Sequence, residues 1–381
     1  MFSFRRSLFS ILGVAIGVLP CALAAQSAAK PKAILSIHGY LTQAYGFSHG
    51  GMVTGLTSSG TADYGRAAVL ASYAVSPDNR FVVQVAHRRL GDSPTMQFED
   101  NVKLDMAFFE HKFRDGTRVR FGKTVMPFGI YNEIRYAGTL QPFYRAPLSV
   151  YWEGTYTAET IDGAMISRQV RTGKPWELTA DLFGGSNTFL EFGTFQTAPT
   201  APPSYVGAKI QAKNVFGTQL WLATPIEGLR LGLSGRRHTD FGGIYSRVVG
   251  VEAKEWTASV DGTFEKFLVR AEQGERRAQG VGIASKYAQL GFRPMELFSV
   301  NVQSEFMDYR LPAGISPLVP NATNVKMLRD NAASINLFLN PTTVFKLEAH
   351  TTKGLNLEQV VNLFGAPQKG SYFISSFSVS F

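Results

Sequence analysis

The chain has 381 residues, 45% of them hydrophobic, with 37 glycines, 29 phenylalanines, 14 tyrosines and a single cysteine. This composition favours strands and turns, and one cysteine excludes a small secreted domain held together by disulfides. The formal net charge of +9 points to anionic partners, although the excess is modest for this length. No linker or break in composition follows Lys32, so we expect one domain.

Residues 1–24 have the pattern of a secretory signal peptide. Arg5 and Arg6 precede an apolar run from Leu8 to Leu19, and Ala22-Leu23-Ala24 provides small residues for cleavage. The apolar run is shorter than the roughly 20 residues that a membrane-spanning helix needs. Cleavage would leave a mature chain, residues 25–381, with a net charge of about +7 and without Cys21.

From Ile34 onward, apolar and polar side chains alternate in segment after segment, as in strands with one apolar and one polar face. Pro77-Asp78-Asn79 and Asn340-Pro341-Thr342 are typical of the tight turns that join such segments. The pattern predicts about sixteen strands, with seven short turns at one end and about eight longer loops at the other.

The alternation also assigns faces to individual residues. The alternation places Phe108 on the apolar face of its strand together with Leu104 and Met106. It places Lys209 and Lys213 on the polar face of a strand from about Tyr205 to Ala223. Asp261-Gly262 is interpreted as a hairpin turn.

The last twelve residues, Gly370 to Phe381, form the strand that decides the fold class. Phe373, Phe377, Val379 and Phe381 share one parity, opposite mostly serines. A chain that ends inside a strand leaves an edge to be paired, and its own first strand is the simplest partner. The pattern also resembles the C-terminal assembly signal of Gram-negative outer-membrane barrels, so we assign that role to Phe377, Val379 and Phe381.

The prediction is therefore an all-β fold, a transmembrane antiparallel β-barrel of about sixteen strands. A bilayer requires internally bonded backbone and apolar outward side chains, and the apolar faces hold almost no charge. An amphipathic terminal strand would also suit a soluble sandwich, but the difference between short turns and long loops does not. A propeller would show a repeat of roughly 40 to 50 residues, and none is found.

One connection, residues 124–159, is much longer than a hairpin needs and is dense in tyrosine, phenylalanine and tryptophan. Such a loop is expected to be packed and functional. Together with Gly122 to Asn132, Arg135 to Gly154, Thr224 to Leu231 and the Asn340-Pro341 turn, it resembles the porin family that includes the phosphate-selective porins O and P. The resemblance implies an inward-folded constriction loop.

The same resemblance implies a passive, water-filled, homotrimeric channel in the Gram-negative outer membrane, with anion preference and phosphate among its solutes. Small hydrophilic or anionic solutes, outer-membrane lipid and the barrel assembly machinery are the partners that follow. No cofactor is expected. Unlike those phosphate porins, whose lumen and constriction loop are densely basic, this loop balances Arg135 and Arg145 with Glu133 and Glu153.

Strand parity supplies the other candidates for pore lining and selectivity. Basic residues exceed acidic ones on the polar faces, which favours weak anion preference without tight binding. An equally weighted alternative is that rows of opposite charge only brace the barrel wall. The candidate basic residues on strands are Arg66, Arg118, Arg120, Lys209, Lys213, Arg230, Arg236, Arg270 and Lys346.

Catalytic chemistry is not indicated. The six histidines show no metal-ligand spacing, and no Gly-x-Ser-x-Gly elbow occurs, so we expect neither an enzyme nor a metal site. No glycine-rich phosphate loop follows a strand, and no nucleic-acid partner is expected. A substrate-specific channel, a structural or adhesin-like barrel and, less favoured, a barrel hydrolase stay open as alternatives to a general porin.

Overall fold

The computed structural model describes residues 34–96, 101–135, 137–151, 159–171, 176–195, 204–243, 250–278, 280–312, 324–354 and 368–381. The signal peptide expected at residues 1–24 lies outside this part of the chain. The described residues form sixteen strands, and their bounds are β1 Ile34–His49, β2 Thr61–Ser76, β3 Asn79–Leu90, β4 Lys103–Lys112, β5 Arg118–Val125, β6 Thr160–Arg171, β7 Glu177–Phe195, β8 Ser204–Ala223, β9 Leu229–Gly242, β10 Val251–Phe264, β11 Phe267–Ala278, β12 Val281–Met295, β13 Phe298–Arg310, β14 Val325–Asn340, β15 Thr343–Gly354 and β16 Gln368–Ser380.

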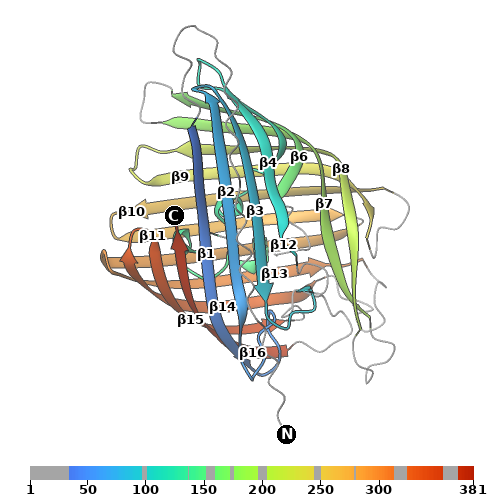
Figure 1. Cartoon of the computed structure of the whole chain (residues 1–381). Helices are drawn as coiled ribbons and strands as arrows, with labels where there is room; N and C mark the ends of the chain where they lie inside the picture. Colours follow the sequence, from blue (N-terminus) through green and yellow to red (C-terminus); the bar gives the residue numbers. More distant parts are fainter. Residues whose placement is uncertain are drawn as a thin grey trace, which may run out of the picture.

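The sixteen strands form a closed antiparallel barrel in which each strand pairs with its neighbours in sequence and β1 pairs with β16 (Figure 1). Leu41 lies opposite Val379 across this seam. The backbones of Gly39 and Phe381 exchange two hydrogen bonds of 2.9 and 3.0 Å. The predicted closure of the terminal strand on the first is confirmed, as is the strand number.

The two ends of the barrel differ as the sequence predicts. Seven short turns join the pairs β2–β3, β4–β5, β6–β7, β8–β9, β10–β11, β12–β13 and β14–β15. The opposite end holds the other connections, including the long one between β5 and β6. One of these, between Ala278 of β11 and Val281 of β12, is as short as a turn, which the sequence did not predict. Local chemistry sets the turns: the Asn340 Oδ1 atom accepts a hydrogen bond from the Thr342 amide at 2.9 Å. Gly228 has φ +80°, and a Cβ there would lie 1.9 Å from the Thr263 carbonyl oxygen. Only glycine fits that turn.

The barrel is apolar outside and polar inside. Leu41, Phe121 and Leu233 are each more than half exposed on the outer face. Glu272 and Glu348 face the interior and are buried. This inverts the arrangement of a water-soluble protein and matches a wall whose outer face meets hydrocarbon. Among the described residues, no helix is long and apolar enough to cross a bilayer.

Two β-bulges change which side chains face inward from what the sequence predicts. In β8, Asn214 has φ +53° and the register with β9 shifts between Lys213 and Phe216. The shift places Ile210 inward and leaves Lys209 and Lys213 exposed on the outward face, so their predicted pore-lining position is wrong.

The second bulge lies in β4. Gln84 of β3 faces Met106, whereas the next residue of β3, Val85, faces Leu104, so Asp105 is the extra residue. Phe108 therefore points inward and is 8% exposed, instead of sharing the outer face with Leu104. Both differences have one cause: an inserted residue makes the side chains before it and after it in the strand follow opposite parities.

Asp261 and Gly262 are not a turn. β10 continues through both of them to Phe264, and the chain reverses at Glu265, which has φ +38°. Asp261 points inward and is 7% exposed, paired in register with Arg230 and Arg270. The Asp-Gly signal was misleading because β10 stays paired with β11 for two residues beyond Gly262.

Candidate functional site

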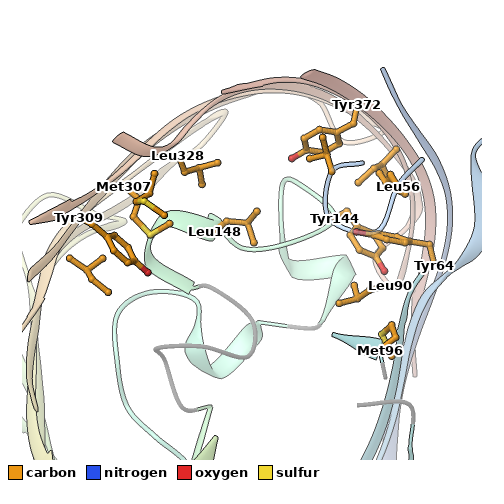
Figure 2. Close-up of a cluster of buried hydrophobic side chains, with 14 of the residues drawn as sticks. Leu56, Tyr64, Leu90, Met96, Tyr144, Leu148, Met307, Tyr309, Leu328 and Tyr372 are labelled. Carbon is orange, nitrogen blue, oxygen red and sulfur yellow. The ribbon is translucent and has the colours of Figure 1, made fainter. Parts of the chain in front are cut away.

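The segment between β5 and β6 lies against the inner face of the barrel wall. Its described part holds the short helices η1 Asn132–Ile134, η2 Gly138–Leu140 and α2 Leu148–Tyr151. Tyr144 and Leu148 from this segment pack with side chains from distant strands, among them Tyr64, Met307 and Tyr372 (Figure 2). Figure 2 shows the segment curving inside the arc of strands.

Carboxylates of the wall accept hydrogen bonds from backbone amides of this segment. The Ile130 amide donates to Glu272 at 3.0 Å, the Tyr144 amide to Glu348 at 2.5 Å and the Ser149 amide to Glu305 at 2.6 Å. These acceptors come from β11, β15 and β13. Through these three hydrogen bonds, three strands of the wall hold the segment.

Glu272 is the most heavily used of these carboxylates. Besides Ile130, it accepts hydrogen bonds from Tyr287 at 2.7 Å, from Ser259 at 2.5 Å and from the Tyr151 hydroxyl at the end of α2. Its side chain is 3% exposed. A buried carboxylate with four donors is satisfied only when the segment is in place.

Wall donors complete the attachment by binding carbonyl groups of the segment. The Lys346 ammonium is 1% exposed and donates to the carbonyls of Gln141 at 2.6 Å and Phe143 at 3.0 Å. Arg66 donates to the Tyr144 carbonyl at 3.2 Å, with its guanidinium 4.4 Å from the Tyr144 ring centroid. These two predicted pore residues bind the segment.

Arg135 and Arg145, the two basic residues predicted to set selectivity, are 2% and 5% exposed. Arg135 lies 3.1 Å from the Glu159 carboxylate. Arg145 donates to the Thr54 hydroxyl at 2.7 Å and to the Tyr64 hydroxyl at 2.5 Å. Both side chains hold the segment in its fold, and little of either meets the lumen.

Replacing Arg145 with alanine is expected to destabilise the folded barrel by about 2 kcal/mol, because hydrogen bonds to a charged group are lost in a buried place. Chloride selectivity is expected to change little. Thermal unfolding and reversal potentials of the same preparation measure the two effects. If selectivity changed while stability did not, the Arg145 side chain would have to line the route of the ions.

On the other side of the interior, charged side chains stay accessible. Glu110 of β4 lies between Arg80 of β3 and Arg120 of β5, at 2.7 Å from each. The Arg80 side chain is 44% exposed and that of Arg120 19%. Arg118, two residues before Arg120 on β5, is exposed. One carboxylate thus serves two arginines, which leaves excess positive charge.

A second Arg-Asp-Arg group faces the interior on β9 to β11. Asp261 lies 2.7 Å from Arg230 and 2.9 Å from Arg270. The Arg230 guanidinium stacks 4.1 Å from the Trp221 ring centroid and remains 46% exposed, while Arg270 donates to the Tyr131 hydroxyl at 3.0 Å. This group also has one more cation than anions.

Glu133, at the centre of η1, is exposed and is acted on by charges from both sides. The surrounding protein displaces water and raises the pKa of the Glu133 carboxyl, while Arg120 and Arg230 lower it and Asp181 raises it. The carboxyl thus lies within electrostatic reach of both arginine groups. We call these two arginine groups, together with the neighbouring charged side chains, the charged passage. It consists of Arg80, Glu110, Arg118, Arg120, Glu133, Asp181, Arg230, Asp261 and Arg270.

The sequence-predicted residues thus occupy three environments. Arg118, Arg120, Glu133, Arg230 and Arg270 belong to the charged passage. Lys209 and Lys213 lie outside the barrel, and Glu153 lies outside the described residues. Those buried beneath or within the segment are Arg66, Arg135, Arg145, Arg236 and Lys346.

Besides Asp181, which lies on the polar parity of its strand, three residues of the charged passage were missed from the sequence. Arg80 directly follows the predicted Pro77-Asp78-Asn79 turn, Glu110 lies beyond the bulge of β4 and Asp261 was assigned to a turn. Glu110 lies opposite Arg120, and Asp261 lies opposite Arg230. This register would have identified them, but it is set by the pairing of the whole sheet and not by one strand. Within the described ranges, no group of three or more His, Cys, Asp or Glu side chains could hold a metal ion.

Comparison with known proteins supports the fold of this chain. No family model matches the chain, and no curated protein matches its sequence. Among solved structures, the outer membrane channel DcaP of Acinetobacter baumannii has a TM-score of 0.59 at 10% identity, covering 92% of this chain and 99% of that one.

Two further structures are similar over comparable lengths. OmpT of Vibrio cholerae in its trimer form has a TM-score of 0.52 at 11% identity, covering 92% of this chain and 99% of that one. An anion-selective porin from Comamonas acidovorans has a TM-score of 0.54 at 10% identity, covering 92% and 100%. The chain shares the fold of these outer-membrane barrels.

Proposed function

We propose that the protein is a passive diffusion channel of a Gram-negative outer membrane for small hydrophilic solutes and ions, with weak anion preference. The observation behind this proposal is a charged interior with accessible Arg118, Glu133 and Arg230 inside a closed barrel that is apolar outside. The similarity to an outer membrane channel and to an anion-selective porin supports it.

The position of the β5–β6 segment supports a route for solutes. Its hydrogen bonds reach β2 and strands from β8 to β16, so we place the passage beside β3 to β5, from where it reaches the Arg230 group. Five arginines and four carboxylates make up the charged passage. The excess of one positive charge favours anions, phosphate among them, without fixing any in place.

The proposal has three further features. Residues 1–24 serve as a cleaved signal peptide that directs export, and Phe377, Val379 and Phe381 direct barrel assembly. The protein forms a homotrimer, as the trimer form of OmpT does. The segment 124–159 acts as the constriction loop.

Swelling of liposomes that contain the refolded protein tests the channel. Neutral sugars of increasing size are expected to enter at falling rates, because a passive pore sorts neutral solutes by size. Protein-free liposomes and liposomes with heat-denatured protein are the controls. A folded barrel that admits none of the sugars would contradict the channel and favour a structural or adhesin-like barrel.

Replacing Glu133 with glutamine is expected to increase the preference for chloride, because it removes one of the four carboxylates of the charged passage. In the wild type the same change is expected on acidification, and at a higher pH than for an ordinary glutamate, because the pKa of Glu133 is raised. Reversal potentials in a KCl gradient at several pH values measure both effects. If the variant keeps the wild-type pH dependence, another group is responsible.

A further inference from the structure

Outward-facing cations form two rows near the loop end of the barrel. In the first row, Lys254 of β10 is the register partner of both Arg237 of β9 and Arg277 of β11. In the second, Lys353 of β15 is the register partner of both Arg329 of β14 and Lys369 of β16. Each row therefore places three cations directly side by side on three adjacent strands.

Both rows are accessible on the outer surface of the wall. Arg237, Lys254, Arg277, Lys353 and Lys369 are exposed, and the Arg329 side chain is 24% exposed. Like charges directly opposite each other across two strands destabilise a sheet. A row of three would therefore cost stability unless anions lie close to it.

Carboxylates of the chain compensate these rows only in part. Glu252 lies 3.1 Å from Lys254, and Glu275 lies 3.0 Å from Arg277. Glu275 is shared with a further cation, Arg310, at 2.9 Å. In the second row, Asp308 pairs with Arg329. Among the described residues that face outward here, positive charge exceeds negative charge in both rows.

The outer surface changes from apolar to basic where the first row lies. Along β10 the outward residues are Val260, Ala258 and Trp256, and the next is Lys254. Trp256 is 40% exposed. Tryptophan at the edge of an apolar band is typical of the boundary between hydrocarbon and headgroups. The row thus lies at headgroup height.

The displaced lysines of β8 extend this surface. Lys209 and Lys213 are exposed on the same outer face, on the strand next to Arg237. The Lys213 ammonium lies 5.0 Å from the ring centroid of Phe241. Residues that the sequence placed in the pore are thus part of an outward basic surface spanning β8 to β11.

We propose that the two basic rows bind phosphate groups of lipid headgroups in the leaflet at the loop end of the barrel. The proposal rests on the outer-membrane location proposed above. Cations near a membrane surface each attract anionic lipid, and a row of three can contact phosphates that are held on one lipid molecule. The rows would then order lipid around the channel.

Native mass spectrometry of the refolded full chain in a neutral detergent tests this binding. The probe is bisphosphorylated lipid A, compared with the same lipid after removal of its phosphates. One variant combines Arg237→Gln, Lys254→Gln and Arg277→Gln, and a second combines Arg329→Gln, Lys353→Gln and Lys369→Gln. A matched control, Arg114→Gln with Arg171→Gln and Lys266→Gln, removes three cations at the short-turn end.

The wild type is expected to retain the phosphorylated lipid in preference to the dephosphorylated one. Each row variant is expected to retain about half as much phosphorylated lipid as the wild type, because the other row still binds, and the control is expected to retain as much as the wild type. Equal binding of both lipids by the wild type, or undiminished binding by both row variants, would overturn the proposal. So would binding of inorganic phosphate that depends on the rows without retention of lipid.

Conductance separates this inference from the proposed function. The row residues lie outside the barrel, so both row variants are expected to conduct like the wild type, which also shows that they are folded. Wild-type conductance without phosphate-dependent lipid binding would reject the lipid site alone. Phosphate-dependent lipid binding by a barrel that does not conduct would reject the channel alone.

Discussion

Replacing Glu272 with alanine is expected to release the β5–β6 segment from the wall and to increase the single-channel conductance, with a noisier open level. Glu272 accepts hydrogen bonds from the Ile130 amide and from Tyr287, Ser259 and Tyr151. Its loss leaves four buried donors without their acceptor. A destabilisation of about 3 kcal/mol is expected, which thermal unfolding would measure.

Two other variants make this result interpretable. Glu275→Ala lies on the same strand but faces outward, where its carboxylate pairs with Arg277 and Arg310, so conductance is expected to stay at the wild-type level. Glu272→Gln keeps an oxygen for the Ile130 amide and is expected to lie between wild type and alanine. Unchanged conductance in a folded Glu272→Ala protein would mean that the segment does not narrow the passage.

Reversing Arg120 and Arg230 together to glutamate is expected to convert weak chloride preference into potassium preference. The two arginines belong to different groups of the charged passage and are both accessible. A unit charge at about 4 Å in water acts with about 1 kcal/mol. Reversing the sign of one such charge changes the interaction by about 2 kcal/mol. Since 1.4 kcal/mol is tenfold, the permeability ratio is expected to shift by more than roughly tenfold toward potassium.

The double variant Lys209→Glu with Lys213→Glu makes the same change of charge on the outer face of β8. Its reversal potential is expected to equal that of the wild type. If the outward pair shifts selectivity as much as the inward pair, then the charged passage does not control which ions pass. Comparison of the two double variants thus tests the inward and outward assignment directly.

The number of strands and their closure could be predicted because each strand carries its own period-two pattern and each short turn its own local chemistry. The pairing of Leu41 with Val379 needed only the inference that a terminal edge must be covered. The β-bulges could not be predicted from these local patterns. The extra residues at Asn214 and Asp105 are set by pairing with neighbouring strands, and each reverses the facing of later residues.

The candidate site was harder to predict because its residues act in groups. Parity correctly placed Arg66 and Lys346 inside the barrel, yet both bind carbonyls of the β5–β6 segment. That use depends on how the segment packs, which no local pattern specifies. Arg120 and Arg230 were identified, but their shared partners Glu110 and Asp261 were not.

Single-channel recording of the refolded wild-type protein in a planar bilayer, under a KCl gradient, shows whether the barrel conducts and which ion it prefers. Stable open steps are expected, with a reversal potential displaced modestly toward that of chloride, because five arginines face four carboxylates. A folded protein that gives no open steps would contradict the channel. Open steps that strongly favour potassium would contradict the account of the charged passage.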